Sequence, residues 1–388
     1  MTQRITTFDE FRDAVSAYRL PRVLLAALDR KRIVTQRITT FDEFRDAVSA
    51  YRLPRVLLAA LDLDLFTTIG DRSWTIPDLA KELKVSERGL SILCRNLAAV
   101  GVLQKKRVRY KNSRLGATAL NAHHRAYRGG YLKLIKSHWA DWIRISESVR
   151  SGLPIDHDIP DNPDYRRQFT WAMHHRTLEI APAIATQIPL AHSQTLLDLG
   201  GGPGTYAMAF LAKHPMLHAT VCDREAALEV AKEIASTHKA RRRLSYLPLD
   251  FSNEPIPGMY DVIWYSNVLH IYSPEENKAI FRRVWAALRP GGRFIIQDAF
   301  LHDREGLYPV EASLFAVSML LFTRGGDTYS TAETTRWLKE AGFVGVKPVR
   351  LKKGTGDWEG GILEASVPGP PPKTTVRRTR SSRNRKAH

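Results

Sequence analysis

Apolar residues in the first third of the chain recur three or four positions apart, which is the spacing of one face of an α-helix. The stretch VLLAALDLDLFTTI (56–69) follows this spacing and predicts a single helix. A second helix is predicted to open at Thr75, because Thr75 can cap it and Pro77 suits its first turn. A third is predicted to begin at Ser86 and to end near Gly101.

Residues 102–116 change to an alternation of polar and apolar positions, which predicts a short β-wing after the three helices. Three helices and a wing form a winged-helix arrangement, which can enter a DNA groove or pair two subunits. Basic side chains on the wing favour nucleic acid slightly, although basic wings are often solvated strand edges: Lys105, Lys106, Arg107, Arg109 and Lys111.

After a helical stretch at about 130–185, the chain alternates between short apolar runs and helical segments, which predicts parallel strands joined by helices. The predicted strands are residues 195–199, 219–223, 244–249, 260–265 and 293–298. The sequence therefore predicts an α/β fold with a doubly wound, Rossmann-like sheet.

The first of these strands runs into the glycine-rich turn Gly200-Gly201-Gly202-Pro203-Gly204, and a helix is predicted from near Thr205. Glycines let the backbone approach a ligand that a Cβ atom would exclude. Asp198 lies just before the turn, and Asp223 ends the second strand. An acid at the end of the second strand is where a ribose diol is held in such folds.

Two adenosine-containing cofactors compete for this turn. Residues 202–207 satisfy the GxGxxA pattern of nicotinamide cofactors, but that pattern alone is weak. Three features favour S-adenosylmethionine: the turn is DxGxGxG, no group that would neutralise a pyrophosphate is evident, and the third strand ends in Asp250-Phe251. An acid beside an aromatic ring suits the amine and the ring face of adenine.

The motifs LLDLGGGPG, SNVLH and LRPGGR, with Asp223 and the Asp250-Phe251 pair, resemble a known family over about residues 50–366. The family is that of S-adenosylmethionine-dependent O-methyltransferases with an N-terminal winged-helix dimerisation domain, which includes caffeate, hydroxyneurosporene and acetylserotonin O-methyltransferases. The resemblance implies a class I methyltransferase fold, a homodimer paired through the winged helix, and a small hydroxylated substrate. Because the winged helix of this family pairs subunits, the resemblance implies that nucleic acid would be contacted only weakly, by the basic tail.

The resemblance also implies roles for single residues. Gly200, Gly201 and Gly202 would hold the methionine part of the cofactor, with Asp198 just before them. Asp223 would hold the ribose, and Asp250 and Phe251 the adenine. Ser266 matches a cofactor-contact position that is often lysine in plant members.

For catalysis, the resemblance implies that His270 is the general base and that Asp298 orients it. The chain departs from the plant pattern in two places: Ile271-Tyr272 follows the histidine, and Thr328 replaces a second glutamate. The methylated atom is therefore open between oxygen and carbon. A winged-helix regulator that keeps this fold as a ligand sensor is the other alternative, although a sensor would not need the base.

The segment around residue 170 carries candidates for a substrate wall. Phe169, Trp171 and Met173 could line an aromatic pocket or equally belong to the core. His174-His175 is adjacent in sequence and fits a surface or pocket-lining pair better than a metal site. Because no His, Asp or Glu cluster has ligand spacing, a magnesium-assisted mechanism is disfavoured.

Charge changes this picture little. The net charge is +18, of which residues 369–388 carry +7 and residues 2–34 carry +3. The main body is therefore only mildly basic, and total charge does not support nucleic-acid binding. The chain has two cysteines, which favours a reducing cytoplasmic setting over a disulfide scaffold, and its apolar runs are shorter than a membrane span.

Residues 2–29 recur letter for letter at 35–62. A perfect pair with no third copy favours a recent duplication over a structural repeat, so residues 1–34 are interpreted as an expendable extension. A doubled dimerisation helix is the alternative. The predicted units are this extension, a winged-helix dimerisation domain (35–125), a helical linker with the substrate pocket (126–185), a cofactor-binding domain (186–368) and a disordered basic tail (369–388).

Overall fold

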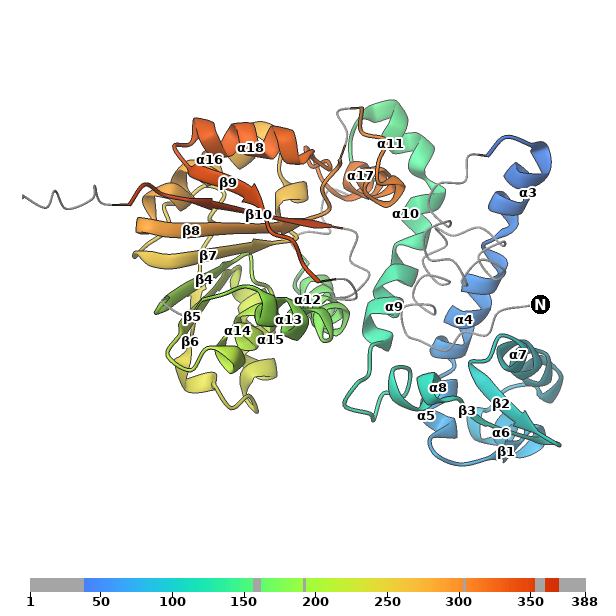
Figure 1. The fold of residues 1–388 in the computed structure, drawn as a ribbon. Coiled ribbons are helices and arrows are strands. Elements are labelled where there is room, and N and C mark those ends of the chain that lie inside the picture. Colours follow the sequence, from blue (N-terminus) through green and yellow to red (C-terminus); the bar gives the residue numbers. More distant parts are fainter. Residues whose placement is uncertain (1–37, 156–161, 191–192, 303–304, 353–359, 370–388) are drawn as a thin grey trace, which may run out of the picture.

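The computed structural model describes residues 38–155, 162–190, 193–302, 305–352 and 360–369 (Figure 1). The predicted N-terminal extension lies outside the described residues, as does the basic tail beyond Gly369. The described ranges cover most of the two predicted domains and of the helical segment that joins them.

The first described helices are α3 (Phe41–Ser49), α4 (Arg52–Asp62) and α5 (Leu65–Ile69). The prediction of one helix over 56–69 is wrong, because the chain breaks at Asp64, which has a left-handed φ of +52°. That conformation cannot continue a right-handed helix. Leu57, Leu58 and Leu61 on α4 still turn into the core together with Leu65.

The rest of the winged helix follows the sequence pattern. Helix α6 (Ile76–Leu83) begins after Thr75, whose hydroxyl accepts a hydrogen bond from the Asp78 N–H, and α7 (Glu87–Ala99) is capped by Ser86. Strands β2 (Leu103–Lys106) and β3 (Arg109–Asn112) form the wing, and β1 (Trp74–Thr75) pairs with β3. Helix α8 (Arg114–Thr118) completes the unit. The predicted Thr75 cap, the start of the third helix at Ser86 and the wing are confirmed.

Between the two domains, residues 129–155 and 162–187 contain five helices: α9 (Gly129–Ser137), α10 (Trp139–Ile143), α11 (Ile145–Ser151), α12 (Pro163–Thr177) and α13 (Ile180–Gln187). Leu132 of α9 is buried in the same core as α4 to α8, and Trp139 packs against it. Helix α12 packs on α15 (Glu225–Ala235) of the second domain, and α11 packs on α17 (Val310–Phe322). Helices α9 to α11 therefore lie between the winged helix and the sheet domain, and α12 and α13 pack on the sheet domain itself (Figure 1).

The second domain is built on a seven-stranded sheet with the order β6-β5-β4-β7-β8-β10-β9. Its parallel part consists of β4 (Thr195–Leu199), β5 (His218–Asp223), β6 (Leu244–Pro248), β7 (Tyr260–Ser266) and β8 (Leu288–Asp298). Strands β9 (Val344–Pro348) and β10 (Gly361–Ser366) complete it, with β10 antiparallel to β8. The predicted doubly wound α/β fold is confirmed, although β8 begins five residues earlier than expected.

Helices cover both faces of this sheet. On one face α13, α14 (Thr205–Lys213) and α15 (Glu225–Ala235) bury residues such as Ile184, Phe210 and Leu228. On the other face α16 (Pro274–Ala286) and α18 (Thr331–Glu340) bury Phe281 and Trp337. Figure 1 shows α17 (Val310–Phe322) set apart from both layers, beside the linker helices.

The strand order locates the ligand site. Strands β5 and β6 lie on one side of β4, and β7 and β8 lie on the other, so the chain reverses direction across the sheet at β4. Doubly wound sheets bind ligands at the carboxyl ends of the strands beside such a reversal. The residues that follow β4, β5, β7 and β8 therefore meet at one edge.

Candidate active site

The loop between β4 and α14 is shaped by its glycines. Gly200 and Gly202 have φ values of +69° and +49°, in the left-handed region that a Cβ atom makes costly. A Cβ on Gly200 would lie 2.7 Å from Val268 Cγ2. On Gly202, the nearest described atom to a Cβ would be Asp223 Oδ2, at 3.9 Å. The loop therefore leaves open space above Gly202, beside an acid.

Asp198 lies beneath this loop and is 2% exposed. Its Oδ2 accepts a hydrogen bond from the Ala207 N–H in the first turn of α14, at 3.1 Å. Burial raises the pKa of Asp198 to about 7, the Ala207 hydrogen bond acts against that rise, and the nearby Asp223 carboxyl adds to it. A Cβ on Gly201 would lie 2.7 Å from the Asp198 carboxyl carbon. Asp198 thus ties the glycine loop to the helix that follows it.

Asp223 ends β5 and faces the same loop. Its Oδ2 accepts the Gly202 N–H and its Oδ1 accepts the Arg224 N–H, both at 2.8 Å. Burial raises the pKa of Asp223, and these two hydrogen bonds offset part of the rise. A carboxylate oxygen has two lone pairs, so each oxygen can still accept a hydrogen bond from a ligand hydroxyl. Asp223 is therefore both fixed in place and able to bind a diol.

Phe251 forms the far wall of the loop. Its buried ring meets Tyr265 and Tyr272 edge-on, with centroids 6.4 Å and 6.1 Å away. Its Cζ would lie 3.4 Å from a Cβ on Gly200, so the ring borders the glycine turn directly. An aromatic ring therefore lies at the Gly200 end of the loop, and Asp223 lies at the Gly202 end.

Asp250 directly precedes Phe251, and its carboxylate is hydrogen-bonded to residues of the turn that follows it. Its carboxylate accepts hydrogen bonds from the hydroxyl and backbone N–H of Ser252 and from the Asn253 side chain. The Ser252 hydroxyl hydrogen bond holds the pKa of Asp250 below its usual range. The acid is therefore ionised and rigid at neutral pH.

Ser266 ends β7 on the same edge of the sheet. Its hydroxyl donates to Gln297 Oε1 at 3.1 Å and accepts the Asn267 side-chain N–H at 2.8 Å. Asn267 has a φ of +58°, and its backbone N–H donates to the Gln297 carbonyl. These bonds fix the turn that leads from β7 to His270.

His270 lies on the short 3₁₀ turn η3 (Leu269–Ile271), and Asp298 lies at the end of the neighbouring strand β8. The two side chains are 7% and 1% exposed, and His270 Nδ1 lies 2.8 Å from Asp298 Oδ1. A carboxylate can only accept a hydrogen bond, so it holds the ring proton on Nδ1. Nε2 then keeps its lone pair. Asp298 Oδ1 also accepts the Ala299 N–H at 2.7 Å, which fixes the carboxylate itself.

Helix α17 covers the imidazole. The Phe315 ring packs edge-on against His270, with centroids 4.7 Å apart. Thr328, where the sequence departs from the plant pattern, is buried, and its hydroxyl donates to the Ala312 carbonyl at 3.1 Å. A Cβ on Gly326 would clash with the carbonyl oxygen of His270. The loop after α17 is therefore packed directly on the backbone of the candidate base.

The three predicted wall residues on α12 do not share one face. Phe169 and Met173 are one turn apart, whereas Trp171 lies about 200° round the helix from Phe169. All three side chains are half-buried. The Trp171 ring contacts the ring of His174, whose Nδ1 lies 2.8 Å from the Thr205 hydroxyl at the start of α14. Trp171 thus packs beside the contact between α12 and the start of α14.

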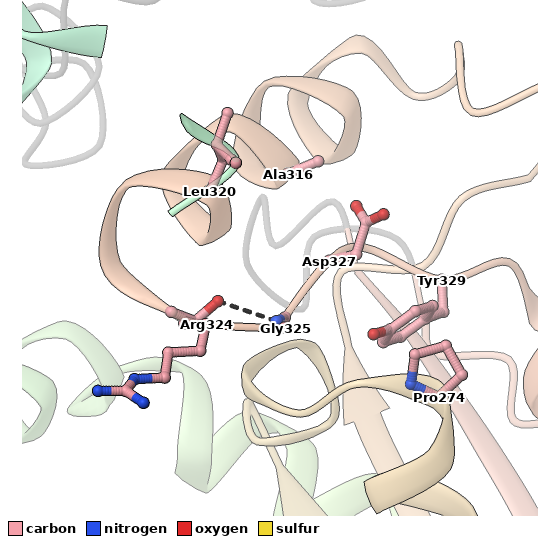
Figure 2. Close-up of a pocket in the computed structure, with 10 residues that line it drawn as sticks. Pro274, Ala316, Leu320, Arg324, Gly325, Asp327 and Tyr329 are labelled. Atoms are coloured by element: carbon pink, nitrogen blue, oxygen red, sulfur yellow. Dashed lines mark hydrogen bonds between the residues drawn. The ribbon is translucent and has the colours of Figure 1, made fainter. Parts of the chain in front are cut away.

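A cavity of about 290 Å³ lies near the candidate base, on another side of α17 (Figure 2). Its lining includes Ala316 and Leu320 of α17, Asp327 and Tyr329 of the loop after α17, and Pro274 of α16. At about 100° per residue, Ala316 and Leu320 are turned well away from Phe315. The cavity therefore does not open onto the imidazole face that Phe315 covers.

The described ranges hold no candidate metal site: no group of three or more His, Cys, Asp or Glu side chains converges there in the manner of metal ligands. Nor does any helix in this part of the chain have the length and apolar character needed to cross a membrane.

Two family models match the chain. An O-methyltransferase domain matches residues 140–344, which is more than half of the chain, and an O-methyltransferase dimerisation domain matches residues 46–122. The chain belongs to this O-methyltransferase family. It is an S-adenosylmethionine-dependent methyltransferase, and the resemblance found in the sequence motifs is confirmed.

Named relatives of the methyltransferase include two enzymes from Streptomyces. The 3-hydroxy-5-methyl-1-naphthoate 3-O-methyltransferase of Streptomyces sahachiroi is 28% identical, with 74% of this chain and 85% of that protein covered. The tetracenomycin polyketide 8-O-methyltransferase of Streptomyces glaucescens is 27% identical, with 74% and 86% covered. The structure of human N-acetylserotonin methyltransferase with S-adenosylmethionine shares the fold, with a TM-score of 0.74 at 20% identity, and covers 86% of this chain and 99% of that one.

The residues of the glycine loop fit the cofactor of this family. The open space above Gly202 is bordered by Asp223 Oδ2, and the ring of Phe251 borders the neighbouring Gly200. A charged diol-binding group and an aromatic wall are what an adenosine requires. Gly200 has no room for a side chain, which keeps the loop close to the ligand.

Sequence reasoning missed several contacts of the methyltransferase site. Phe315 gave no signal, because residues 310–322 are apolar nearly all round the helix and no face stands out. Thr328 was noted as a departure, but its bond to Ala312 depends on a long-range contact. Gln297 precedes Asp298 on β8, and strand alternation could have pointed it away from Asp298 and toward Ser266.

Proposed function

We propose that this methyltransferase transfers a methyl group to a hydroxyl oxygen on a fused aromatic metabolite, with His270 as general base. The single observation that carries the proposal is the buried His270–Asp298 pair at the carboxyl edge of the sheet. Relatives named for a naphthoate and for a polyketide support the substrate class. Phe315, which packs against His270, supplies an aromatic surface for such a ring.

The reaction requires a nucleophile and its alignment. Bound S-adenosylmethionine supplies an activated methyl group. A phenol with a pKa near 10 is ionised only about one part in a thousand at neutral pH, so it needs a base. The lone pair on His270 Nε2 takes the hydroxyl proton as the oxygen bonds to the methyl carbon. Asp298 then stabilises the imidazolium, because its carboxylate already holds the Nδ1 proton.

The other site residues are assigned by their contacts. We assign Asp223 to the ribose hydroxyls, Gly200 to Gly202 and Asp198 to the methionine end, and Phe251 with Asp250 to the adenine. Ser266 lies on the same edge, where its hydroxyl borders Gln297. On α12, the shared face of Phe169 and Met173 is the better candidate for a substrate wall than Trp171.

We propose that the enzyme is a homodimer paired through the N-terminal domain (35–125). Helix α3 presents an exposed apolar face with no described cover: Phe41 is 77% exposed, Phe44 56% and Val48 62%. These residues lie three to four positions apart, so they share one side of the helix. We also propose that residues 126–185 form a helical linker with the substrate pocket and that residues 186–368 form the cofactor-binding domain.

The test is turnover with labelled S-adenosylmethionine and a panel of phenols and naphthols. Transfer of label to a hydroxyl oxygen, identified by mass spectrometry of the product, is the expected result. Transfer to a ring carbon would support the alternative C-methyltransferase. The regulator alternative is not favoured, since the methyltransferase domain is that of an enzyme family.

A further inference from the structure

One narrow face of α17 carries an alternation of polar and aromatic side chains. Glu311, Phe315, Ser318 and Phe322 fall within an arc of about 60° at 100° per residue. All four are half-buried. This face, the α17 strip, differs from the side of α17 that lines the cavity in Figure 2.

The strip joins two histidines. At one position Phe315 packs on His270, with ring centroids 4.7 Å apart. Two turns further on, Phe322 packs on the His138 ring, with centroids 4.5 Å apart. Seven residues of helix separate the two contacts, which is about 10 Å along its axis. The α17 strip therefore runs from the candidate base to a second imidazole.

That second imidazole is bonded to a phenol. His138, between α9 and α10, places Nε2 3.0 Å from the hydroxyl of Tyr165 on α12. Helix α17 thus contacts His138 at the α9–α10 junction, and His138 in turn is bonded to α12. Within the described part of the chain, this is the one hydrogen bond that the polar side-chain atoms of either residue make.

The pair is uncharged and has a donor to spare. Burial lowers the pKa of His138 to about 4 and raises the pKa of Tyr165 to about 12, so both are neutral at pH 7. If the tyrosine donates to Nε2, the ring keeps an Nδ1–H. If Nε2–H donates instead, the tyrosine O–H is left. In either arrangement, one hydrogen-bond donor has no partner among the residues that the structure describes.

We propose that His138 and Tyr165 are a specificity pair that binds an uncharged hydrogen-bond acceptor, such as a carbonyl oxygen, on the far end of the substrate. The inference rests on the proposed function, because His270 marks the hydroxyl that is methylated. The acceptor atom lies about 10 Å from that hydroxyl, and the rings of Phe315 and Phe322 cover the fused aromatic system between them. The preferred substrates are thus elongated fused-ring phenols with a distal carbonyl.

The test compares 6-acetyl-2-naphthol with 6-isopropyl-2-naphthol, which have similar shapes and differ in the carbonyl. The wild-type enzyme is expected to favour the acetyl compound by about tenfold in kcat/KM and in Kd, the effect of one buried hydrogen bond. Binding is measured by calorimetry with S-adenosylhomocysteine present, so it does not depend on turnover. The double variant His138→Leu/Tyr165→Phe is expected to bind both compounds equally.

Two single variants separate recognition from packing. His138→Gln keeps a side-chain N–H donor and is expected to keep the preference. Phe169→Leu, one turn from Tyr165 on α12, changes the proposed substrate wall without removing a hydrogen-bond donor, so it is expected to weaken the binding of both compounds by the same factor.

The results also separate this inference from the proposed function. Equal wild-type Kd values for the two naphthols, or no binding of either, would overturn the specificity pair. So would a preference that persists in the double variant. Methylation of both compounds with equal kcat/KM would leave the proposed function standing and remove only the pair. A wild-type Kd preference without turnover would support the pair and count against the proposed function.

Discussion

His270 Nδ1 and Asp298 Oδ1 lie 2.8 Å apart, and both residues are buried. The two residues come from neighbouring parallel strands, one from the turn after β7 and the other from the end of β8. The register of the sheet therefore sets the geometry of the pair. Because Asp298 Oδ1 is also held by the Ala299 N–H, the acceptor is fixed before any substrate binds.

Replacing Asp298 separates the charge of the acceptor from its position. In Asp298→Asn the Ala299 N–H still favours an oxygen at the Oδ1 site, so the amide oxygen should continue to accept Nδ1–H. We expect kcat/KM to fall by about 10-fold, which is less than the loss for His270→Ala, because only the charge disappears. In Asp298→Ala no acceptor holds the proton on His270 Nδ1, so kcat/KM should fall further than in Asp298→Asn. Equal rates for the wild type and both variants would contradict the orienting role.

Replacing Asp223 tests the cofactor assignment. Asp223→Ala removes a half-buried carboxylate acceptor, which is worth about 1.5–3 kcal/mol or roughly 10- to 100-fold in affinity for S-adenosylmethionine. Calorimetry on the wild type and the variant measures this directly. Glu229→Ala, elsewhere in the same domain, serves as the control and should bind normally. An unchanged Kd in Asp223→Ala would remove the residue from the site.

The buried carboxyl of Asp198 should make stability depend on pH. Its pKa is raised from 3.8 to about 7 by burial, so between about pH 4 and pH 7 the folded enzyme keeps a proton that the unfolded chain releases. Stability should therefore fall as pH rises through this window, by up to about 1.4 kcal/mol per pH unit, and level off above it. Denaturant unfolding of the cofactor-free wild type and Asp198→Asn isolates the effect. The same slope in both proteins would show that another group is responsible.

The exposed face of α3 predicts where the dimer can be broken. Phe44→Asp places a charge in that apolar face, and sedimentation should show a shift from dimer to monomer. Met216→Asp changes a side chain that is 81% exposed in the other domain and should leave the dimer intact. A Phe44→Asp protein that stays dimeric would place the interface elsewhere.

Much of this architecture could be predicted from local patterns. Asp198, Asp223 and His270 all lie at or just after apolar strands, and parallel strands bring their carboxyl ends to one edge. Thr75 and Ser86 are visible as caps because capping depends on residues close in sequence. These features require no knowledge of long-range packing.

Other features depend on contacts between distant segments. The break at Asp64 interrupts a stretch whose apolar spacing is continuous, so the pattern there does not reveal it. Phe315 lies on a helix that is apolar nearly all round, and its contact with His270 depends on how α17 docks. Trp171 and Phe169 are both aromatic and close in sequence, but they lie about 200° apart round α12. Local sequence does not encode which side of a helix meets which neighbour.

The central claim is that His270 is the general base for methyl transfer to a hydroxyl, and His270→Ala tests it most directly. General-base catalysis is worth about 10²–10⁴ in rate, so kcat/KM toward an aromatic hydroxyl should fall by that factor. The Kd for S-adenosylmethionine, measured by calorimetry on the same protein, should stay within about twofold of the wild type, a difference below about 0.5 kcal/mol. Near-normal turnover in His270→Ala with unchanged cofactor binding would contradict the account and leave positioning of the substrate as the source of catalysis.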